Sequence, residues 1–314
     1  MPEDMATWQD TRRPRISVIT TNKNSARYLR ATIESVLAQD FTDYEHIIVD
    51  GSSTDTSIDI IKSYPHLRWI SEIDNSPNDG FRKGFEMARG DYIMIMCVSD
   101  VYLSKSWFRR CVETMESDHE VSLVWGLSVE MNDADDINGV WQPHFIDTPP
   151  PQKRSFLTLW LATGLLFPEL NYCVRRQIFL SNFPVKQNED VVSEYNPFVG
   201  FIYNFNVNGY LAQFLPLIAH CGRKHDGQHG QVIAPKAKLA NDEYHRRIKK
   251  YRRELALGTR THVFRDGESL PVGKMSMLQA LLIPIVCGAR KLSFQLSQVI
   301  NLGLALNKLR RLFG

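Results

Sequence analysis

Short apolar segments alternate with amphipathic segments along the first hundred residues of this chain. The apolar runs at 16–20, 45–49, 67–71 and 92–98 are predicted strands. Between the first two, Leu29, Ile33 and Val36 recur at the spacing of a helix. Strands that alternate with helices indicate βαβ units and a mostly parallel sheet. The chain is therefore expected to have an α/β fold.

An aspartate follows each of two predicted strands. Asp50 comes directly after the run at 45–49, and Asp100 stands at the exit of the run at 92–98. Open α/β sheets bind ligands in the crevice beyond the carboxyl ends of their strands. The two carboxylates predict a site for a diphosphate with its divalent metal, and for the base and ribose of a nucleotide.

The turn after the first predicted strand contains no glycine. Neither a Gly-x-Gly-x-x-Gly loop nor a Gly-Lys-Ser/Thr loop is present there. Instead, the hydroxyl of Thr20 and the amide of Asn22 can bond a base or a ribose. This argues against a dinucleotide or ATP cradle and favours a site that reads a nucleoside with side chains.

Charge and composition exclude several classes of protein. The formal net charge is +2, so no nucleic-acid partner is expected, and the apolar and charged fractions of 43% and 23% are those of soluble globular proteins. Five cysteines without a Cys-x-x-Cys pair argue against a disulfide framework or a thiolate zinc site. Residues 1–15 are polar, and Gln279 and Pro284 interrupt the apolar stretch at 278–289. Neither a signal peptide nor a spanning helix is expected, which predicts a cytoplasmic protein.

The second half gives a less regular pattern. Helices are predicted at 104–117, 156–166, 175–182, 197–206 and 242–257, strands at 121–125, 172–174 and 210–216, a hairpin of 127–131 with 139–142, and an amphipathic stretch at 276–313. Asp133 and Asp135 form an acidic pair inside the hairpin. Because aspartate, asparagine and glycine are turn formers, a turn is favoured over a metal site there.

Seven segments of the first hundred residues together resemble family 2 glycosyltransferases of the GT-A fold. They are 16–20, 35–39, 45–55, 71–74, 79–84, 88–92 and 99–103, and 167–176 resembles a later segment of that family, which ends in paired arginines. The resemblance implies a mostly parallel, Rossmann-like sheet flanked by helices. The expected organisation is a polar leader (1–13), a GT-A domain (14–235, with a donor half at 14–105 and an acceptor half at 106–235) and a helical extension (236–314).

The resemblance also implies a reaction. An inverting enzyme of this family moves a sugar from a nucleotide diphosphate donor to an acceptor hydroxyl. A UDP-sugar is the favoured donor here, and a glycan or lipid-linked saccharide of the cell envelope, such as a surface polysaccharide or O-antigen, is the favoured acceptor. Mg²⁺ or Mn²⁺ would stabilise the leaving diphosphate, and a carboxylate would accept the proton of the attacking hydroxyl.

The family motifs assign roles to individual residues. By resemblance, Asp50 would bond the nucleobase, Asp79 the nucleoside or its phosphate surroundings, and Lys83 would offset diphosphate charge. Asp100 matches the metal-binding aspartate. Ser99 stands where the family usually has a second aspartate, so weaker metal binding is expected, although serine can bond ribose or a metal-bound water. The expected base is Glu194, with Asp190 and Glu189 as rivals.

The sequence leaves alternative functions and alternative residue roles open. Ser99 and the unassigned base are compatible with a catalytically weak donor-binding homologue that acts as a structural or regulatory subunit of a glycan-assembly complex. A nucleotidyltransferase is disfavoured, because the first loop lacks the expected glycines. His220, His225 and His229 are predicted in a flexible loop that faces solvent or the acceptor, with a metal ligand as the less favoured role.

A basic run at 245–253 precedes the amphipathic stretch at 276–313. It is either a solvated helix face or a patch for anionic lipid headgroups or a lipid diphosphate acceptor. Such a patch would bring the chain to the inner face of the cytoplasmic membrane. The apolar stripe that follows can equally pack on the catalytic domain or pair with a second copy in a homo-oligomer.

Overall fold

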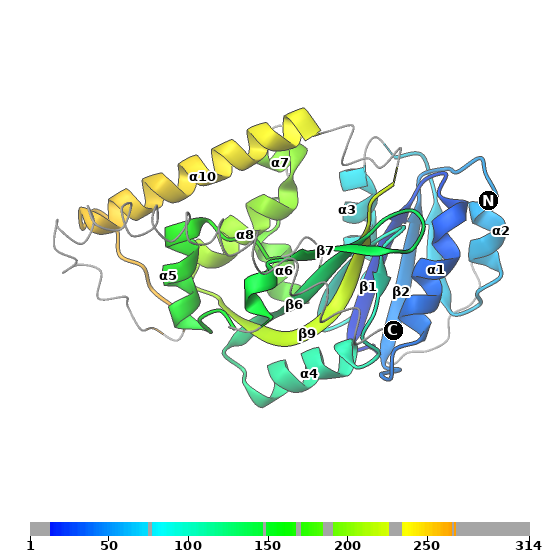
Figure 1. Ribbon diagram of the computed structural model, residues 1–314, viewed down its shortest axis with the longest axis horizontal. Coiled ribbons are helices and arrows are strands. Elements are labelled where there is room, and N and C mark those ends of the chain that lie inside the picture. Colours follow the sequence, from blue (N-terminus) through cyan, green and yellow to red (C-terminus); the bar gives the residue numbers. More distant parts are fainter. Residues whose placement is uncertain are drawn as a thin grey trace.

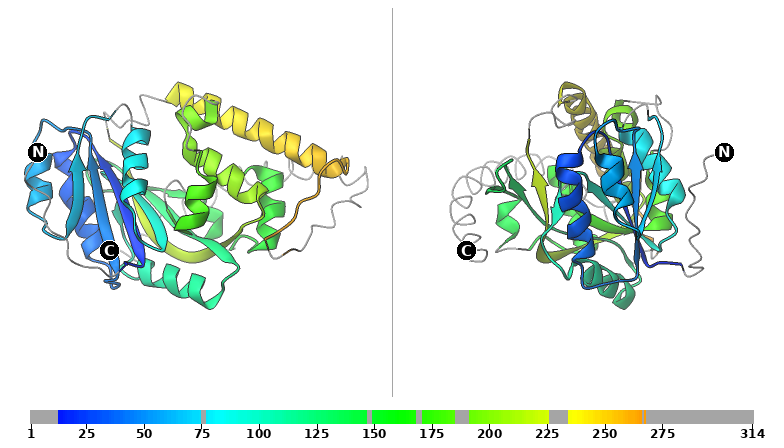
Figure 2. Two further views of the ribbon diagram at one scale, coloured as in Figure 1. Left: turned by 180° about the vertical axis from the view of Figure 1, so that it is seen from behind. Right: turned by 90° about the vertical axis from the view of Figure 1, so that its right-hand side faces the viewer.

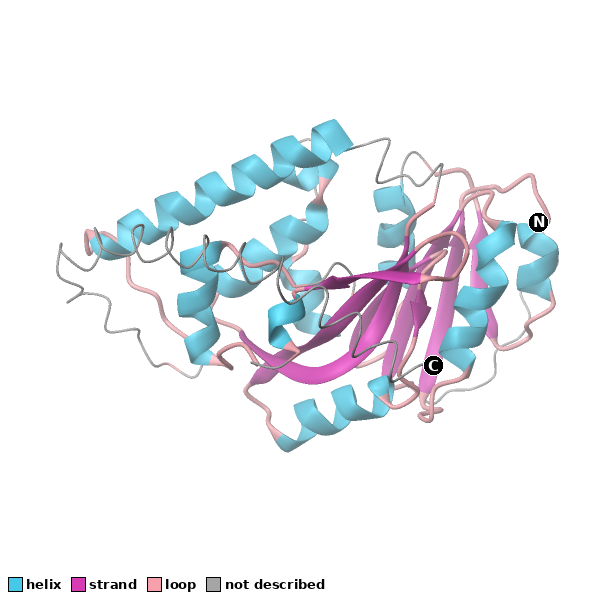
Figure 3. Cartoon of the chain, in the orientation of Figure 1, coloured by secondary structure: helices cyan, strands magenta, loops and turns pink. Residues whose placement is uncertain are grey.

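The computed structural model describes residues 13–265 and 267 of the 314-residue chain, except 75–76, 147–148, 168–170, 185–190 and 226–233. The described residues form one nine-stranded mixed sheet with helices on both faces (Figures 1 and 3). The strand order is β3-β2-β1-β4-β8-β6-β9-β5, and β7 pairs with β6 outside this path. The predicted α/β fold is therefore confirmed.

The first half is the parallel βαβ part of the sheet. Its strands are β1 (Ile16–Asn22), β2 (Tyr44–Asp50), β3 (Leu67–Ser71) and β4 (Tyr92–Cys97), and its helices are α1 (Ala26–Leu37), α2 (Ser57–Lys62) and α3 (Pro77–Met87). β1 pairs in parallel with both β2 and β4, and β2 with β3. The carboxyl ends of β2, β1 and β4 therefore lie side by side at one edge of the sheet.

The alternation of side chains along β2 explains how both faces of the sheet are covered. Ile47 and Val49 belong to the core cluster that contains Phe81 and Phe85 of α3. Ile48 belongs instead to the cluster that contains residues of α1 and α2. Because successive strand residues point to opposite faces, α3 covers one face and α1 with α2 the other (Figure 2).

Two glycines allow close approach in this half. A Cβ on Gly84 of α3 would lie 2.4 Å from Cγ2 of Ile19, so α3 packs against β1 at a distance that only glycine permits. A Cβ on Gly90 would lie 2.5 Å from the backbone nitrogen of Ser17. Both belong to segments that carry the family resemblance, and their positions give a packing reason for glycine there.

The second half completes the sheet. Its strands are β5 (Val101–Tyr102), β6 (Val121–Met131), β7 (Ile137–Trp141), β8 (Tyr172–Arg175) and β9 (Leu211–Arg223). Its helices are α4 (Trp107–Ser117), the 3₁₀ turn η1 (Pro143–Phe145), α5 (Arg154–Thr163), α6 (Arg176–Asn182), α7 (Val191–Tyr195), α8 (Pro197–Val207) and α10 (Ala234–Ala256).

Two strands of the second half are longer than predicted. The predicted strands at 121–125 and 127–131 are one strand, β6, in which Gly126 is buried. The predicted strand at 210–216 continues as β9 to Arg223. Pro216 is exposed there, next to a register shift between β6 and β9, so the missing N–H of proline is tolerated inside the strand.

The basic helix α10 begins eight residues before its predicted start at 242 and packs along α5, α7 and α8 (Figure 1). Its inner face buries Tyr244, Ile248, Tyr251 and Leu255 in the same core cluster as α3, and the Trp160 indole donates to the Tyr244 hydroxyl at 2.7 Å. The predicted amphipathic stretch at 276–313 lies outside the described residues. No described helix has the length and apolar character required to cross a bilayer.

Candidate active site

The Asp50 carboxylate, at the end of β2, is enclosed by hydrogen bonds. Its oxygens accept from Asn22 Nδ2 at 2.7 Å, Ser53 Oγ at 2.5 Å, Ser53 N at 2.9 Å and Ser71 Oγ at 2.7 Å. The side chain has no exposed surface. These bonds fix the loop that leaves β2, and a nucleobase that bonds Asp50 would have to replace one of the serine hydroxyls.

Thr20 and Asn22 lie on β1 beside this carboxylate. The Thr20 hydroxyl is buried against His46 of β2, with 3.0 Å between Oγ1 and Nε2. Burial, with His66 nearby, lowers the pKa of His46 to about 3, so its ring is neutral at physiological pH. Asn22 differs, because its Oδ1 is buried and accepts no hydrogen bond within the described structure. Of the two side chains, Asn22 is the one that offers an acceptor to a ligand N–H.

Asp79 and Lys83 stand on α3, near the same edge. Asp79 lies in the first turn of the helix and pairs with Arg82. Lys83 Nζ donates to the carbonyl of Ile73 at 3.0 Å and lies 3.2 Å from Oε2 of Glu72. Lys83 therefore already has a carboxylate partner, and contact with a diphosphate would compete with that pair.

A strained turn carries Ser99 and Asp100 out of β4. Ser99 has φ +90°, a conformation that costs a non-glycine residue about 1–3 kcal/mol. The hydroxyl of Thr32 on α1 holds the turn, since it accepts from Ser99 N at 3.2 Å and donates to the carbonyl of Asp100 at 2.9 Å. Such strain is typical of functional sites, where the surrounding structure keeps one residue in a required orientation.

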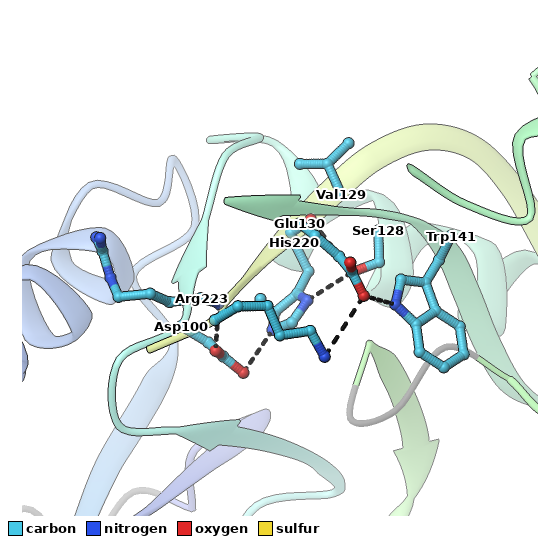
Figure 4. Close-up of a pocket in the computed structure, with 9 residues that line it drawn as sticks. Asp100, Ser128, Val129, Glu130, Trp141, His220 and Arg223 are labelled. Carbon is cyan, nitrogen blue, oxygen red and sulfur yellow. Dashed lines mark hydrogen bonds and ion pairs between the residues drawn. The ribbon is translucent and has the colours of Figure 1, made fainter. Parts of the chain in front are cut away.

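Asp100 faces His220 of β9 (Figure 4). Oδ2 of Asp100 lies 3.3 Å from Nε2 of His220, and Oδ1 accepts from the backbone N–H of Arg223 at 3.0 Å. Both side chains are about nine-tenths buried, with 11% and 4% of their surface exposed. The prediction that His220 lies in a flexible loop was wrong, because β9 continues past Pro216 and brings it into the sheet.

The position of the His220 ring is fixed from its other nitrogen. Nδ1 lies 2.8 Å from the Ser128 hydroxyl, which can itself donate to the carbonyl of His220 at 3.4 Å. In the tautomer with the proton on Nδ1, the ring donates to Ser128 and Nε2 presents a lone pair toward Asp100. Nε2 is buried and has no hydrogen-bond partner among the described residues.

These two side chains fit a divalent metal. A carboxylate oxygen and an imidazole nitrogen converge to 3.3 Å, and both are atoms that ligate divalent metals. Among the described residues, no group of three or more His, Cys, Asp or Glu side chains could hold an ion. Two protein ligands suffice where substrate phosphates and waters complete the shell, as is common for Mg²⁺ at nucleotide sites. Asp100 and His220 are therefore the residues that would hold the metal.

The acidic pair of the hairpin forms the predicted turn between β6 and β7, yet it contacts the site. Asp135 pairs with Arg223, and Asp133 accepts from the Tyr28 hydroxyl at 2.8 Å and lies 3.0 Å from Arg27. The hydrogen bond from Tyr28, with the nearby charge of Arg27, lowers the pKa of Asp133. The turn thus contacts α1 through Asp133 and β9 through Asp135.

The remaining predicted residues lie toward the acceptor half. Glu194 is exposed on α7, and its carbonyl accepts from Asn78 Nδ2 of α3 at 3.3 Å. α7 therefore meets the start of the helix that carries Asp79. Asp190 and Glu189, the alternatives to Glu194 as the base, lie outside the described residues. His225 follows β9 and packs on Tyr28, with 4.5 Å between the ring centroids, while His229 lies outside the described residues.

Sequence reasoning missed Thr32 and Arg223 near Asp100, and it named His220 but placed it in a loop. Thr32 is a buried polar residue within the apolar stripe of α1, and that irregularity is a signal in the sequence. His220 and Arg223 follow Leu217, Ile218 and Ala219, whose apolar character indicates that the strand continues beyond Pro216. Their pairing with Asp100, 120 or more positions earlier, had no local signal.

The first half of the chain is similar in sequence to known glycosyltransferases. The family model described as Glycosyl transferase family 2 matches residues 17–167. An uncharacterized glycosyltransferase of Nostoc sp. is 33% identical over 179 residues, which cover 54% of each chain. A PGL/p-HBAD biosynthesis glycosyltransferase of Mycobacterium tuberculosis is 31% identical over 119 residues, or 36% of this chain and 46% of that one. The chain thus spans about half the length of the curated relatives that it matches.

The fold has counterparts among solved structures. The crystal structure of S. aureus TarS 1–349 in complex with UDP-GlcNAc superposes with a TM-score of 0.55 over 69% of this chain and 60% of that one. The sequence identity is 17%, so this likeness concerns the fold alone.

Proposed function

Residues 17–167 place this chain in glycosyltransferase family 2, and on that premise we propose that it transfers a sugar from a nucleotide diphosphate donor to an acceptor hydroxyl with inversion. The observation that carries the proposal is the meeting of Asp100 and His220 at the carboxyl end of the parallel strands. Ligands of open α/β sheets bind at that edge.

A bound Mg²⁺ or Mn²⁺ would act as a Lewis acid that stabilises negative charge on the leaving diphosphate. The chain's own residues orient the site. Thr32 fixes the strained turn so that the Asp100 carboxylate faces β9, and Ser128 fixes the ring of His220. The backbone N–H of Arg223 holds the second oxygen of Asp100. In this proposal Ser99 bonds ribose or a metal-bound water.

The donor's nucleoside is assigned to the neighbouring strand ends. Asn22 supplies a buried free acceptor, Asp50 holds the loop around the base, and Asp79 lies at the start of α3. Thr20 supports the first strand end through His46, and Lys83 would have to exchange its Glu72 partner for a phosphate. A UDP-sugar is the proposed donor, which is supported by the TarS structure that holds UDP-GlcNAc.

The acceptor hydroxyl must lose a proton to a carboxylate as it attacks. Glu194 is the proposed base, since α7 contacts the start of α3, and Asp190 and Glu189 are the alternatives. The proposed acceptor is a glycan or lipid-linked saccharide of the cell envelope. The name of the mycobacterial relative, which refers to PGL/p-HBAD biosynthesis, supports this class.

The proposal is tested by donor binding and by turnover. Thermal unfolding with UDP, GDP, dTDP or CDP and Mn²⁺ should show stabilisation by one nucleotide, of about 2.7 kcal/mol at 100 times its dissociation constant. Release of UDP from UDP-sugars should fall at least 100-fold in Asp100→Ala. Asp242→Ala removes an exposed carboxylate on α10 and should leave release unchanged.

Stabilisation by a nucleotide without measurable release would favour the second candidate, a donor-binding homologue without turnover. The serine at position 99, in place of a second acid, is the observation that favours it. If no nucleoside diphosphate stabilises the protein, both candidates are excluded.

Contact with an anionic membrane surface is a further part of the proposal. The outward face of α10 exposes Lys238, Arg246, Lys249, Lys250 and Arg253, while its inner face packs on the protein. Polybasic surfaces gain about 1 kcal/mol per lysine or arginine at anionic bilayers. Lys249→Glu with Lys250→Glu should therefore weaken co-sedimentation with vesicles of phosphatidylcholine and phosphatidylglycerol at least 10-fold.

The matched control reverses two exposed lysines elsewhere, Lys62→Glu and Lys105→Glu. Equal loss of binding in the two double variants would show a general charge effect and would exclude α10 as the contact. A helical extension at 236–314 and a homo-oligomer built on it stay proposals beside this one.

A further inference from the structure

We infer that the pocket between Asp100 and Trp141 binds one sugar unit of the acceptor. The pocket lies among β6, β7 and β9, and its lining includes Asp100 and His220 at one end and Glu130, Trp141 and Lys224 at the other (Figure 4). The inference rests on the proposed function, because the inferred sugar belongs to the acceptor, the second substrate of the proposed reaction. It also names the residues that would select that substrate.

The Trp141 end has the chemistry that saccharides require. The indole Nε1 donates to Oε1 of Glu130 at 2.7 Å, which fixes the orientation of the ring. The ammonium of Lys224 lies 3.5 Å from the same oxygen. An aromatic ring offers an apolar surface to the C–H groups of a sugar, while a carboxylate and an ammonium accept from and donate to its hydroxyls. Side-chain exposures of 28% for Glu130 and 56% for Lys224 leave both groups accessible.

The donor diphosphate is not the expected occupant of this end. The Glu130 carboxylate is paired with the Lys224 ammonium, so this pair carries no net positive charge that would hold a diphosphate. The residues proposed for the nucleoside stand at the ends of β1 and β2 and on α3, whereas the Trp141 end is built by β6, β7 and β9. A neutral sugar at Trp141 would therefore lie against other strands than the nucleoside.

The pocket wall is held in place before any ligand binds. The turn that joins β6 to β7 is tied to β9 because Arg223 Nη1 donates to the carbonyl of Asn132 at 3.1 Å. It is tied to α1 because the Tyr28 hydroxyl donates to Asp133 at 2.8 Å. A rigid wall limits the ordering cost of binding, which favours recognition of a small, flexible saccharide. The backbone N–H of Arg223 also donates a hydrogen bond to Asp100, so Arg223 contacts both the pocket wall and the proposed reaction centre.

Saturation-transfer NMR with methyl glycosides tests the inference. The probes are the methyl glycosides of glucose, galactose, mannose, rhamnose and N-acetylglucosamine, each at about 10 mM with UDP and Mn²⁺ present. We expect transfer to the ring protons of at least one probe in the unmodified chain. The signal should fall at least fivefold in Trp141→Ala and in Glu130→Gln, and Trp141→Phe should keep most of it because an aromatic face remains.

The control variant is Trp69→Ala, which removes a half-buried indole from β3 at the other edge of the sheet and should keep the full signal. The thermal shift with UDP is measured on every variant, so that a folded donor site is verified separately. A chain that is stabilised by UDP but gives no transfer to any glycoside, or equal transfer after Trp141→Ala, overturns the inference and leaves the proposed function standing. Absence of a thermal shift with UDP, GDP, dTDP and CDP in the unmodified chain removes the premise and overturns both.

Discussion

Buried His46 should make the folded state sensitive to mild acid. Its ring has no exposed surface and contacts the Thr20 hydroxyl, and burial lowers its pKa from 6.5 to about 3. The unfolded chain therefore takes up a proton near pH 6.5, and the folded chain only near pH 3. Between these values the unfolded state binds more protons, so the free energy of unfolding falls as the pH falls.

The magnitude follows from the width of that interval. Each pH unit below 6.5 contributes about 1.4 kcal/mol, so at about pH 5 the loss due to His46 is about 2 kcal/mol. Urea unfolding near pH 7.5 and near pH 5 measures it, with His46→Gln as the comparison. Glutamine keeps an amide near Thr20 and does not titrate, so the variant should lose about 2 kcal/mol less than the unmodified chain between the two pH values.

Other histidines do not obscure this difference. Burial also lowers the pKa of His262, to about 4, but His262 is present in both proteins and its contribution cancels. His119→Gln, which changes an exposed histidine after α4, should leave the pH dependence as it is in the unmodified chain. If the free energies of unfolding of the unmodified chain and His46→Gln decrease equally, the buried neutral imidazole is not the cause and the reasoning is refuted.

Three further substitutions test packing and chemistry. Gly84→Ala should lower the free energy of unfolding by about 1–3 kcal/mol in urea denaturation, because the new Cβ would lie 2.4 Å from Ile19; unchanged stability would contradict the close approach. Ser99→Asp should lower the Mn²⁺ concentration for half-maximal UDP release several-fold, since it adds a carboxylate beside the metal ligand; an unchanged midpoint would argue against a metal there. Glu194→Gln should reduce transfer at least 100-fold with an unchanged UDP thermal shift, while Glu86→Gln on exposed α3 surface retains activity; near-normal transfer in Glu194→Gln would assign the base elsewhere.

Prediction from the sequence succeeded where structure is local. The apolar runs that became β1, β2 and β4 are buried on both sides, the run that became the edge strand β3 is partly buried, and the repeats of α1 and α3 follow from one helix face packing on a sheet. The hairpin turn was also predictable, because asparagine, aspartate and glycine favour turns whatever surrounds them. The prediction failed at Pro216, because a proline usually ends a strand. Here a register shift between β6 and β9 allows the strand to continue past the proline.

The sequence by itself indicated the α/β fold class, the resemblance to family 2 glycosyltransferases and the shared edge of the sheet at which Asp50 and Asp100 emerge, since strands that alternate with helices run parallel. Only the tertiary structure decided which groups surround these acids. It closed Asp50 within four hydrogen bonds and set His220 of β9 against Asp100. The reason is physical: Asn22 and Ser71 reach Asp50 through the pairing of β2 with β1 and β3, and His220 reaches Asp100 across 120 positions through the pairing of β5 with β9, and no local preference of the chain encodes these pairings.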